Sequence, residues 1–187
     1  QKNPIKGNFD YQHLKDIHKF IFQDVFEWAG KDRAELRLFD TFAKRSPFNP
    51  NYIQNFVPGK ELKKYSKIIF DELKEQNYLK NSKDLNSFAK GMANFLMELN
   101  ALHPFREGNG RTQRIFCNEL AKNAGYKMDL NLISNEKMLI ASVEASQIKP
   151  AKLEALIKAN LKSFKQNLAK EQGIFAGFKK SKEFFTR

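Results

Sequence analysis

The strongest constraint on the fold is a break between two helical patterns, at residues 103–114. Apolar side chains recur at helical spacing over 85–102, and a second helical pattern covers 111–123. Pro104 prevents a smooth helix through the junction. The Gly-Asn-Gly triplet at 108–110 consists of residue types that tolerate positive φ. The two helices must therefore be joined by a tight turn.

This turn is suited to bind an anion. A Gly-rich turn can point successive backbone N–H groups at one position, and the N-terminus of a helix carries partial positive charge. Arg111 and Arg114 are three residues apart, so we expect both guanidinium groups on one helix face. Two such groups can hold phosphate oxygens in bidentate geometry. The segment therefore predicts a phosphate site.

Two further side chains add chemistry to the turn. Glu107 places a carboxylate beside it, and a divalent cation would remove the repulsion between carboxylate and phosphate. His103 supplies a group whose ordinary pKa, about 6.5, suits a general base near neutral pH. The combination indicates attack by a hydroxyl on a phosphorus atom that the turn holds.

Each element of this pattern has an ordinary structural explanation. A histidine before proline is more often structural than catalytic, and Gly-Asn-Gly is commonly only a turn. A glutamate near arginines is usually a surface pair that contributes about 0–1 kcal/mol. The order of all these residues within one short segment is far more specific than any of them alone.

Composition sets broader limits. The 187 residues suit one domain, with 41% hydrophobic residues and 18 phenylalanines. The net charge of +12 favours anionic partners, although many lysines fit solvated helix faces. The single cysteine, Cys117, fits a reducing compartment, and no apolar run reaches the length of a membrane span. We therefore expect a cytoplasmic protein without membrane contact, with delivery into another cell left open.

The remaining chain is predicted to be mainly helical. Caps and breaks indicate further helices after Asp10, after Gly59, after Ser134, and from Pro150 to Leu168, and Ser82 is expected to cap the helix over 85–102. Residues 31–49 are too short and irregular for a helix, and we interpret them as a β-hairpin or extended flap, centred near 35–48. The expected organisation is one all-α domain over 1–175, with a tail at 176–187 that is a short helix or disordered.

Residues 103–114 read H-P-F-R-E-G-N-G-R-T-Q-R, which resembles the Fic (filamentation induced by cAMP) family signature H-x-F-x-[DE]-G-N-G-R-x-x-R at every fixed position. The resemblance extends over about residues 3–170. It includes these shorter segments: Asn3-Pro4-Ile5, Gly7-Asn8-Phe9, Trp28-Ala29-Gly30, Ser46-Pro47-Phe48 and Glu98-Leu99-Asn100. It implies the mainly helical Fic fold with a small hairpin flap.

The resemblance also implies a protein adenylyltransferase that moves AMP from ATP to a Ser, Thr or Tyr hydroxyl of a target protein. Its implied site residues are His103 as the base, Phe105 as the core anchor, Glu107 as the Mg²⁺ ligand, Gly108, Asn109 and Gly110 as the anion hole, Arg111 at the β-phosphate and Arg114 at the γ-phosphate. Lys44 and Arg45 lie in the flap, where they contact nucleotide or target or are ordinary surface charge. The flap itself would bind the target by strand addition.

Other activities within the resemblance stay open. Kinase-like relatives have Lys at the position of Gly110, so Gly110 favours transfer of AMP. The alternatives are transfer of another phosphate-containing group, or a non-catalytic module that binds nucleotide or nucleic acid. The absence of a recognition-helix or base-stacking motif disfavours nucleic acid.

Regulation leaves a second open point. Many relatives carry an inhibitory Ser/Thr-x-x-x-Glu motif whose Glu occupies the second arginine of the signature, and no Ser or Thr of this sequence has Glu four residues later. The motif could lie on a separate antitoxin partner or on a removed segment, or the enzyme could be regulated differently. We favour the separate partner.

Overall fold

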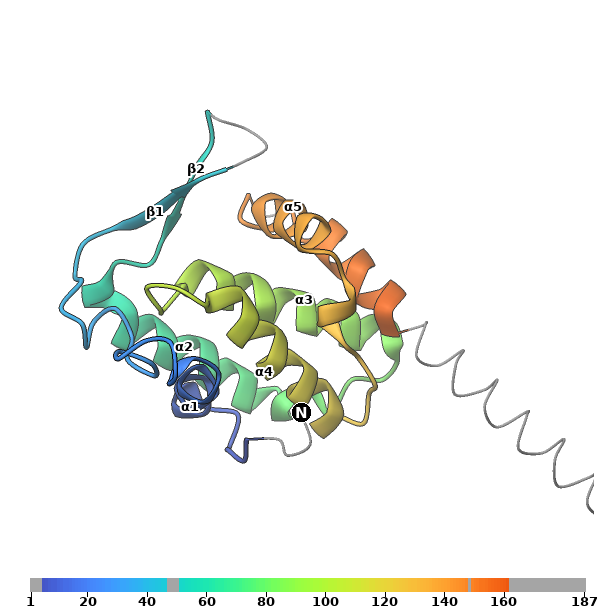
Figure 1. Ribbon diagram of the computed structural model, residues 1–187. Coiled ribbons are helices and arrows are strands. Elements are labelled where there is room, and N and C mark those ends of the chain that lie inside the picture. The colour runs from blue at the N-terminus through green and yellow to red at the C-terminus, as the bar shows by residue number, and fades with distance from the viewer. Residues whose placement is uncertain (1–4, 47–50, 148, 162–187) are drawn as a thin grey trace, which may run out of the picture.

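The computed structural model describes residues 5–46, 51–147 and 149–161. Within these residues the chain is mainly helical and carries one two-stranded antiparallel hairpin (Figure 1). The helices are α1 (Tyr11–Phe22), α2 (Leu62–Glu75), α3 (Leu85–Leu102), α4 (Asn109–Asn123) and α5 (Asn135–Ala145), followed by a further helix over 151–161. The predicted mainly helical fold with a small hairpin is confirmed.

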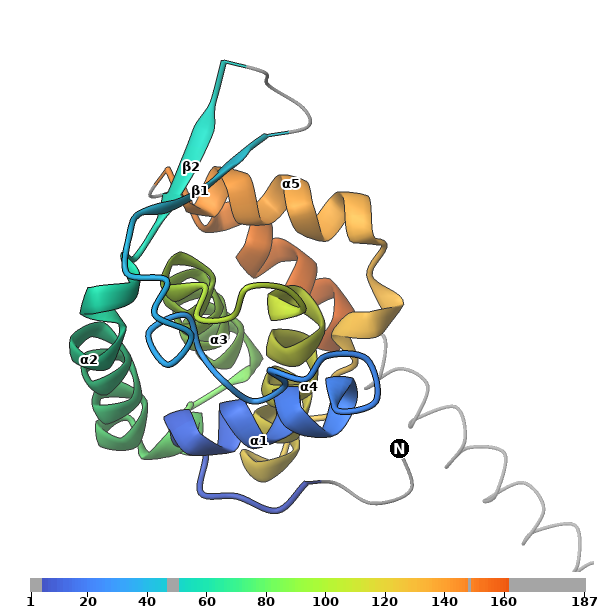
Figure 2. The same cartoon turned by 60° about the vertical axis from the view of Figure 1, so that its left-hand side comes forward.

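Helix α3 is the centre of the packing, as its apolar surface predicts. It contacts α2, α4 and α5, while α1 packs on α4 (Figure 2). Phe88, Met92 and Leu99 of α3 are fully buried in one hydrophobic cluster that extends from Leu14 to Leu161. This arrangement fixes the C-terminal end of α3 and the start of α4 beside each other.

Helix starts follow side-chain caps. Asp10 accepts a hydrogen bond from the His13 N–H, and Ser134 accepts one from the Lys137 N–H, so both predicted caps are confirmed. The prediction that Ser82 caps α3 is wrong. Asp84 caps it instead, because Asp84 and Ser87 bond each other's backbone N–H groups in a capping box.

The hairpin lies later in the chain than the expected 35–48. Strand β1 (Phe42–Arg45) pairs with β2 (Ile53–Phe56), with Phe42 opposite Phe56. The residues before β1 form a turn, because Asp32 and Glu35 each accept a hydrogen bond from the other's backbone N–H. Only four residues of β2 alternate between exposed and buried, which is too few for a clear strand signal.

Predictions for the C-terminal region extend beyond the described residues. The helix over 151–161 begins after Pro150 as expected, and its predicted continuation to Leu168 lies outside the described residues, as does the tail at 176–187. Among the described residues, every helix is too short or too polar to span a lipid bilayer.

Candidate active site

The site is built on the loop that joins α3 to α4. His103 follows the last residue of α3 in a left-handed conformation, with φ 43° and ψ 57°, and Gly108 precedes α4 with φ 83°. Both changes of direction fall within 103–108, as the sequence predicts. Helix α4 begins at Asn109, two residues before the expected Arg111, so Asn109 and Gly110 belong to its first turn.

The two glycines of the triplet serve different purposes. A Cβ on Gly108 would lie 2.4 Å from Cε2 of Phe22, and the positive φ adds strain for any other residue. A Cβ on Gly110 would have no atom within 4 Å. Gly108 is therefore needed for the close approach of α1, whereas Gly110 keeps space open at the start of α4.

The Asn109 side chain holds the loop from inside. Its Oδ1 accepts a hydrogen bond from the Phe105 N–H over 2.9 Å, and its Nδ2 donates to the Phe105 carbonyl over 2.7 Å. Phe105 is buried, with 1% of its surface exposed. The Asn109 side chain thus holds the loop through both its oxygen and its nitrogen, and its backbone N–H lies in the first turn of α4, where it can bind an anion.

His18 of α1 contacts the loop at Phe105 and Glu107. Its Nδ1 accepts a hydrogen bond from the Gly30 N–H over 2.9 Å, so Nε2 carries the proton and donates to the Glu107 carbonyl over 3.0 Å. The ring stacks on Phe105, with centroids 3.9 Å apart. Burial lowers the pKa of His18, which keeps this neutral tautomer in place. Sequence reasoning missed His18, whose signal was a histidine on the apolar face of a helix.

Arg33 binds the start of the same loop, at His103 and Pro104, whereas His18 binds near its end, at Glu107. Its Nε donates to the His103 carbonyl over 3.0 Å, and Nη2 donates to the carbonyls of Leu102 and Val57. Its backbone N–H also donates to the Pro104 carbonyl over 2.8 Å. Only 1% of Arg33 is exposed. This buried side chain ties the end of α3 to the residues that follow β2.

His103 itself lies against the hairpin. Its ring stacks on Phe56 with centroids 3.9 Å apart, and 8% of the residue is exposed. Burial and the positive charges of Lys44 and Arg33 lower its pKa to about 3. The Asn100 backbone raises this pKa slightly, although neither ring nitrogen has a well-formed hydrogen bond within the described residues. The ring is therefore neutral at pH 7, with both nitrogens available.

A cavity of about 390 Å³ opens beside His103, between the hairpin, α3, α4 and α5. Three cationic side chains line it, and no carboxylate does so among the described residues. The lining includes these predicted site residues: Lys44, Arg45, His103, Gly110 and Arg114. A cavity with three cations, no anion and a helix N-terminus at its wall favours a phosphate-containing ligand.

The two motif arginines diverge in this structure. Arg114 lines the cavity, and its Nη1 donates to Oδ1 of Asn135 at the start of α5 over 2.8 Å. The Arg111 guanidinium instead lies over the ring of Phe22 in α1, at 4.4 Å from the ring centroid. The expectation of one shared face for both groups is therefore not met here, and only Arg114 contributes to the cavity wall.

Glu107 is the candidate metal ligand. Its exposed carboxylate accepts a hydrogen bond from the Gly108 N–H over 3.0 Å, directly before the first turn of α4. The described residues hold no group of three or more His, Cys, Asp or Glu side chains that could enclose a metal. One carboxylate beside a phosphate site matches the way Mg²⁺ is commonly held, by few protein ligands together with phosphate oxygens and water.

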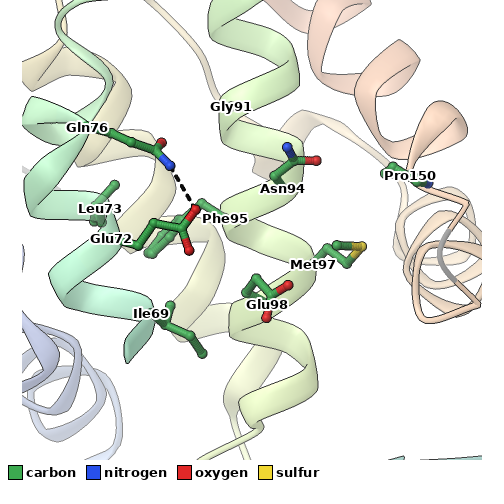
Figure 3. A pocket seen from close by; sticks show the side chains of 10 residues that line it. All are labelled: Ile69, Glu72, Leu73, Gln76, Gly91, Asn94, Phe95, Met97, Glu98 and Pro150. Atoms are coloured by element: carbon green, nitrogen blue, oxygen red, sulfur yellow. Dashed lines mark hydrogen bonds between the residues drawn. The ribbon is translucent and has the colours of Figure 1, made fainter. Parts of the chain in front are cut away.

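A second cavity, of about 310 Å³, lies between α2 and α3 and has the opposite charge (Figure 3). Its charged lining residues are Glu72 and Glu98, and no cation lines it among the described residues. Burial, and then the neighbouring charge of Glu72, raise the pKa of Glu98. A nucleotide would be repelled here, so charge selects the cavity beside His103.

Sequence reasoning missed several residues of the cavity wall. The polar ones include Gln54, Asn100, Gln113, Asn135 and Ser142, and the apolar ones include Phe56, Met138 and Leu139. Gln113 had a readable signal, since it is a polar residue within the motif; it is buried, and its Nε2 donates to the Leu99 carbonyl. Asn100 lies in α3, three residues before His103, and the others come from β2 and α5, far from the motif in sequence.

Comparisons with known proteins identify a family and several similar proteins. The Fic/DOC family matches residues 8–121. The chain is 39% identical over 166 residues to protein adenylyltransferase VbhT of Bartonella schoenbuchensis, covering 89% of this chain and 32% of that protein. It is 35% identical to the probable protein adenylyltransferase y4lH of Sinorhizobium fredii, covering 81% of this chain and 73% of that protein. The chain thus spans about a third of the length of the first relative and most of the second.

Solved structures with nucleotide are also similar. BepC of Bartonella tribocorum with bound AMPPNP has a TM-score of 0.72 and 31% identity, covering 84% of this chain and 77% of that one. The N-terminal Fic domain of a putative cell filamentation protein of Bartonella quintana, with bound ADP, has a TM-score of 0.73 and 33% identity, covering 85% and 76%.

Proposed function

Because the chain belongs to the Fic/DOC family, we propose that it is a protein adenylyltransferase, which transfers AMP from Mg-ATP to a Ser, Thr or Tyr hydroxyl of a target protein. The observation that carries the proposal is the neutral His103 ring at the wall of a cation-lined cavity, with no well-formed hydrogen bond to either ring nitrogen among the described residues. The adenylyltransferase names of the relatives and the nucleotides in similar structures support it.

In the proposed step, His103 takes the proton of the target hydroxyl while the hydroxyl oxygen attacks the α-phosphorus of ATP. The bond from this phosphorus to the bridging oxygen breaks, and pyrophosphate leaves. Burial lowers the His103 pKa most, and the positive charge of Lys44 lowers it further. Bound phosphates would offset the Lys44 charge and raise that pKa toward the range of an efficient base.

The start of α4 would hold the phosphates. Asn109, Gly110 and Arg111 are its first residues, whose backbone N–H groups have no acceptor within the helix. Together with Gly108 they form the proposed anion hole for the α- and β-phosphates. Arg114 would bind the γ-phosphate from the cavity wall, and Arg111 would have to leave Phe22 to reach the β-phosphate.

Glu107 would bind Mg²⁺ after releasing the Gly108 N–H. The ion would neutralise charge on the transferring phosphates when bound. Lys44 and Arg45, which line the cavity from β1, would contact nucleotide or target.

Two partners complete the proposal. Each strand of the two-stranded hairpin has an edge without a pairing strand in the described part of the chain, which supports target docking by strand addition. Nε of Arg114 is buried without a hydrogen-bond partner among the described residues. This atom could receive the Glu of a Ser/Thr-x-x-x-Glu helix supplied by a separate antitoxin.

Labelled ATP tests the proposal and separates it from its alternatives. The protein and a His103→Ala variant are incubated with bacterial and animal cell lysates, Mg²⁺, and ATP labelled at either the α- or the γ-phosphate. Protein labelling from the α-position alone, lost in the variant, supports AMP transfer. Labelling from the γ-position alone would indicate phosphate transfer, and labelling from neither would favour a binding module.

A further inference from the structure

A separate basic groove lies at the base of the hairpin. It has a volume of about 310 Å³ and shares no lining residue with the cavity beside His103. Three arginines and one carboxylate line it: Arg33, Arg37, Arg106 and Asp40. Three positive charges less one negative charge leave an excess of two. Thr41 adds a hydroxyl group to the same wall.

These charges do not neutralise one another. Within the described residues, Arg37, Asp40 and Arg106 make no ion pair and no side-chain hydrogen bond. Nη1 of the buried Arg33 also has no hydrogen-bond partner there. Arg37, Asp40 and Arg106 are exposed, so water can solvate their charges, whereas Arg33 is buried, and a buried polar atom is ordinarily hydrogen-bonded. The groove therefore has the composition of an anion site.

The backbone of Arg37 supports a role for its side chain. Arg37 has φ 57°, a left-handed conformation that costs a non-glycine residue about 1–2 kcal/mol. Glycine or asparagine would adopt it more readily. The local turn therefore gives no reason for an arginine at this position, whereas an anion in the groove does.

The groove lies next to the reacting groups. Arg106 belongs to the same loop as His103, three residues further along the chain. Phe42 lies between the two sites in the contact network, since its ring centroid is 5.7 Å from that of His103 and 5.1 Å from Cζ of Arg33. An extended peptide advances about 3.3 Å per residue, so a segment with its hydroxyl at His103 reaches the groove within about three residues.

We propose that this groove binds an aspartate or glutamate of the target protein, within about three residues of the accepting hydroxyl. The inference rests on the proposed protein AMP transfer and adds a rule for target choice. Arginine pairs with carboxylates in bidentate geometry. Exposed Leu38, in the groove wall, and exposed Phe39 beside it offer apolar contacts for the same segment.

Two substitutions remove the charges without touching Arg33, which holds the catalytic loop. Arg37→Asn keeps a residue type that accepts positive φ, and Arg106→Gln keeps a long polar side chain. Lys74→Gln on the exposed surface of α2 is the control for loss of a positive charge elsewhere. Binding of AMPPNP and thermal unfolding are measured for each variant, so that damage to the fold or the nucleotide site is recognised.

The test uses sites that the wild-type protein modifies in a lysate, identified by mass spectrometry. Peptides are made around each modified hydroxyl, with flanking Asp and Glu kept or replaced by Asn and Gln. We expect acidic residues within three positions of the hydroxyl and at least tenfold faster transfer to the acidic peptides by the wild-type protein. The double variant should lose this preference, while its AMPPNP binding stays unchanged.

The outcomes separate this inference from the proposed function. Modified sites without nearby acidic residues would contradict the proposed role of the groove and leave AMP transfer intact. The same conclusion would follow if the double variant kept the wild-type preference for acidic peptides. Weaker AMPPNP binding in the double variant would assign the groove to the nucleotide instead. If the wild-type protein labels nothing from α-labelled ATP, the proposed function fails first.

Discussion

The Arg33 guanidinium donates to the His103 carbonyl over 3.0 Å, across 70 positions of sequence. Its other hydrogen bonds end on the carbonyls of Leu102 and Val57. His103 has a left-handed backbone, which is unfavourable for a non-glycine residue unless its surroundings fix it. Arg33 provides that restraint, so the direction of the His103 ring depends on a residue outside the motif.

Arg33→Lys should therefore impair transfer more than nucleotide binding. Lysine retains the charge but cannot reach all three carbonyls with the geometry of a guanidinium. We expect a loss of about 2–4 kcal/mol in the free energy of unfolding, since hydrogen bonds from a buried charged group are lost. The rate of AMP transfer should fall at least tenfold while AMPPNP binding changes little. Urea unfolding and transfer kinetics would check this. An unchanged kcat in Arg33→Lys would refute the claim that Arg33 restrains the His103 backbone.

Replacement by alanine should destabilise the protein strongly at Gly108 and little at Gly110. Gly108→Ala places a methyl group 2.4 Å from Phe22 at positive φ, so we expect it to cost about 2–4 kcal/mol. Gly110→Ala meets no atom and should change stability by less than about 1 kcal/mol. It should still weaken AMPPNP binding, because Gly110 lines the cavity. Equal destabilisation by both substitutions would contradict the close contact between Gly108 and Phe22.

Stability should fall as the pH drops below about 6.5, the ordinary pKa of histidine. The folded protein holds the His103 pKa at about 3, so the unfolded chain binds this proton first. The contribution of neutral His103 to the free energy of unfolding is thus complete above pH 6.5 and is lost progressively toward pH 3. Burial lowers the pKa of His18 in the same direction. Urea unfolding at pH 7, 5 and 4 should show a smaller decline for His103→Asn than for wild type.

Metal removal should abolish activity without unfolding the protein. The described residues offer no cluster of three metal-binding side chains, and Glu107 alone cannot hold Mg²⁺ tightly. We expect EDTA to stop AMP transfer and leave the melting temperature unchanged. Glu107→Gln should raise the Mg²⁺ concentration needed for half-maximal transfer. A large drop in melting temperature with EDTA would indicate a structural metal instead.

Much of the fold could be predicted from local sequence patterns, because helix caps and turns depend on residues that are neighbours in the sequence. Asp10 and Ser134 cap their helices through hydrogen bonds to residues three positions away. The left-handed Gly108 likewise follows from its own lack of a side chain. The hairpin was placed too early because its second strand depends on pairing with β1 and on packing of Phe56 against His103, neither of which a short sequence window contains.

The site was predictable only along the motif. His103, Glu107 and the Gly-Asn-Gly turn are contiguous, so their proximity needs no knowledge of tertiary structure. His18, Arg33 and Asn135 reach the same place from three distant elements. The separate directions of Arg111 and Arg114 also depend on tertiary partners, Phe22 in one case and Asn135 in the other.

The central claim is that His103 makes a target hydroxyl attack the α-phosphorus of ATP. Mass spectrometry of a lysate incubated with Mg-ATP tests it most directly, with wild-type protein and the His103→Ala variant in parallel. We predict adenylyl groups on Ser, Thr or Tyr side chains with the wild-type protein and none with the variant, although the variant still binds AMPPNP. Equal modification by both proteins, or phosphate in place of the adenylyl group, would contradict the claim.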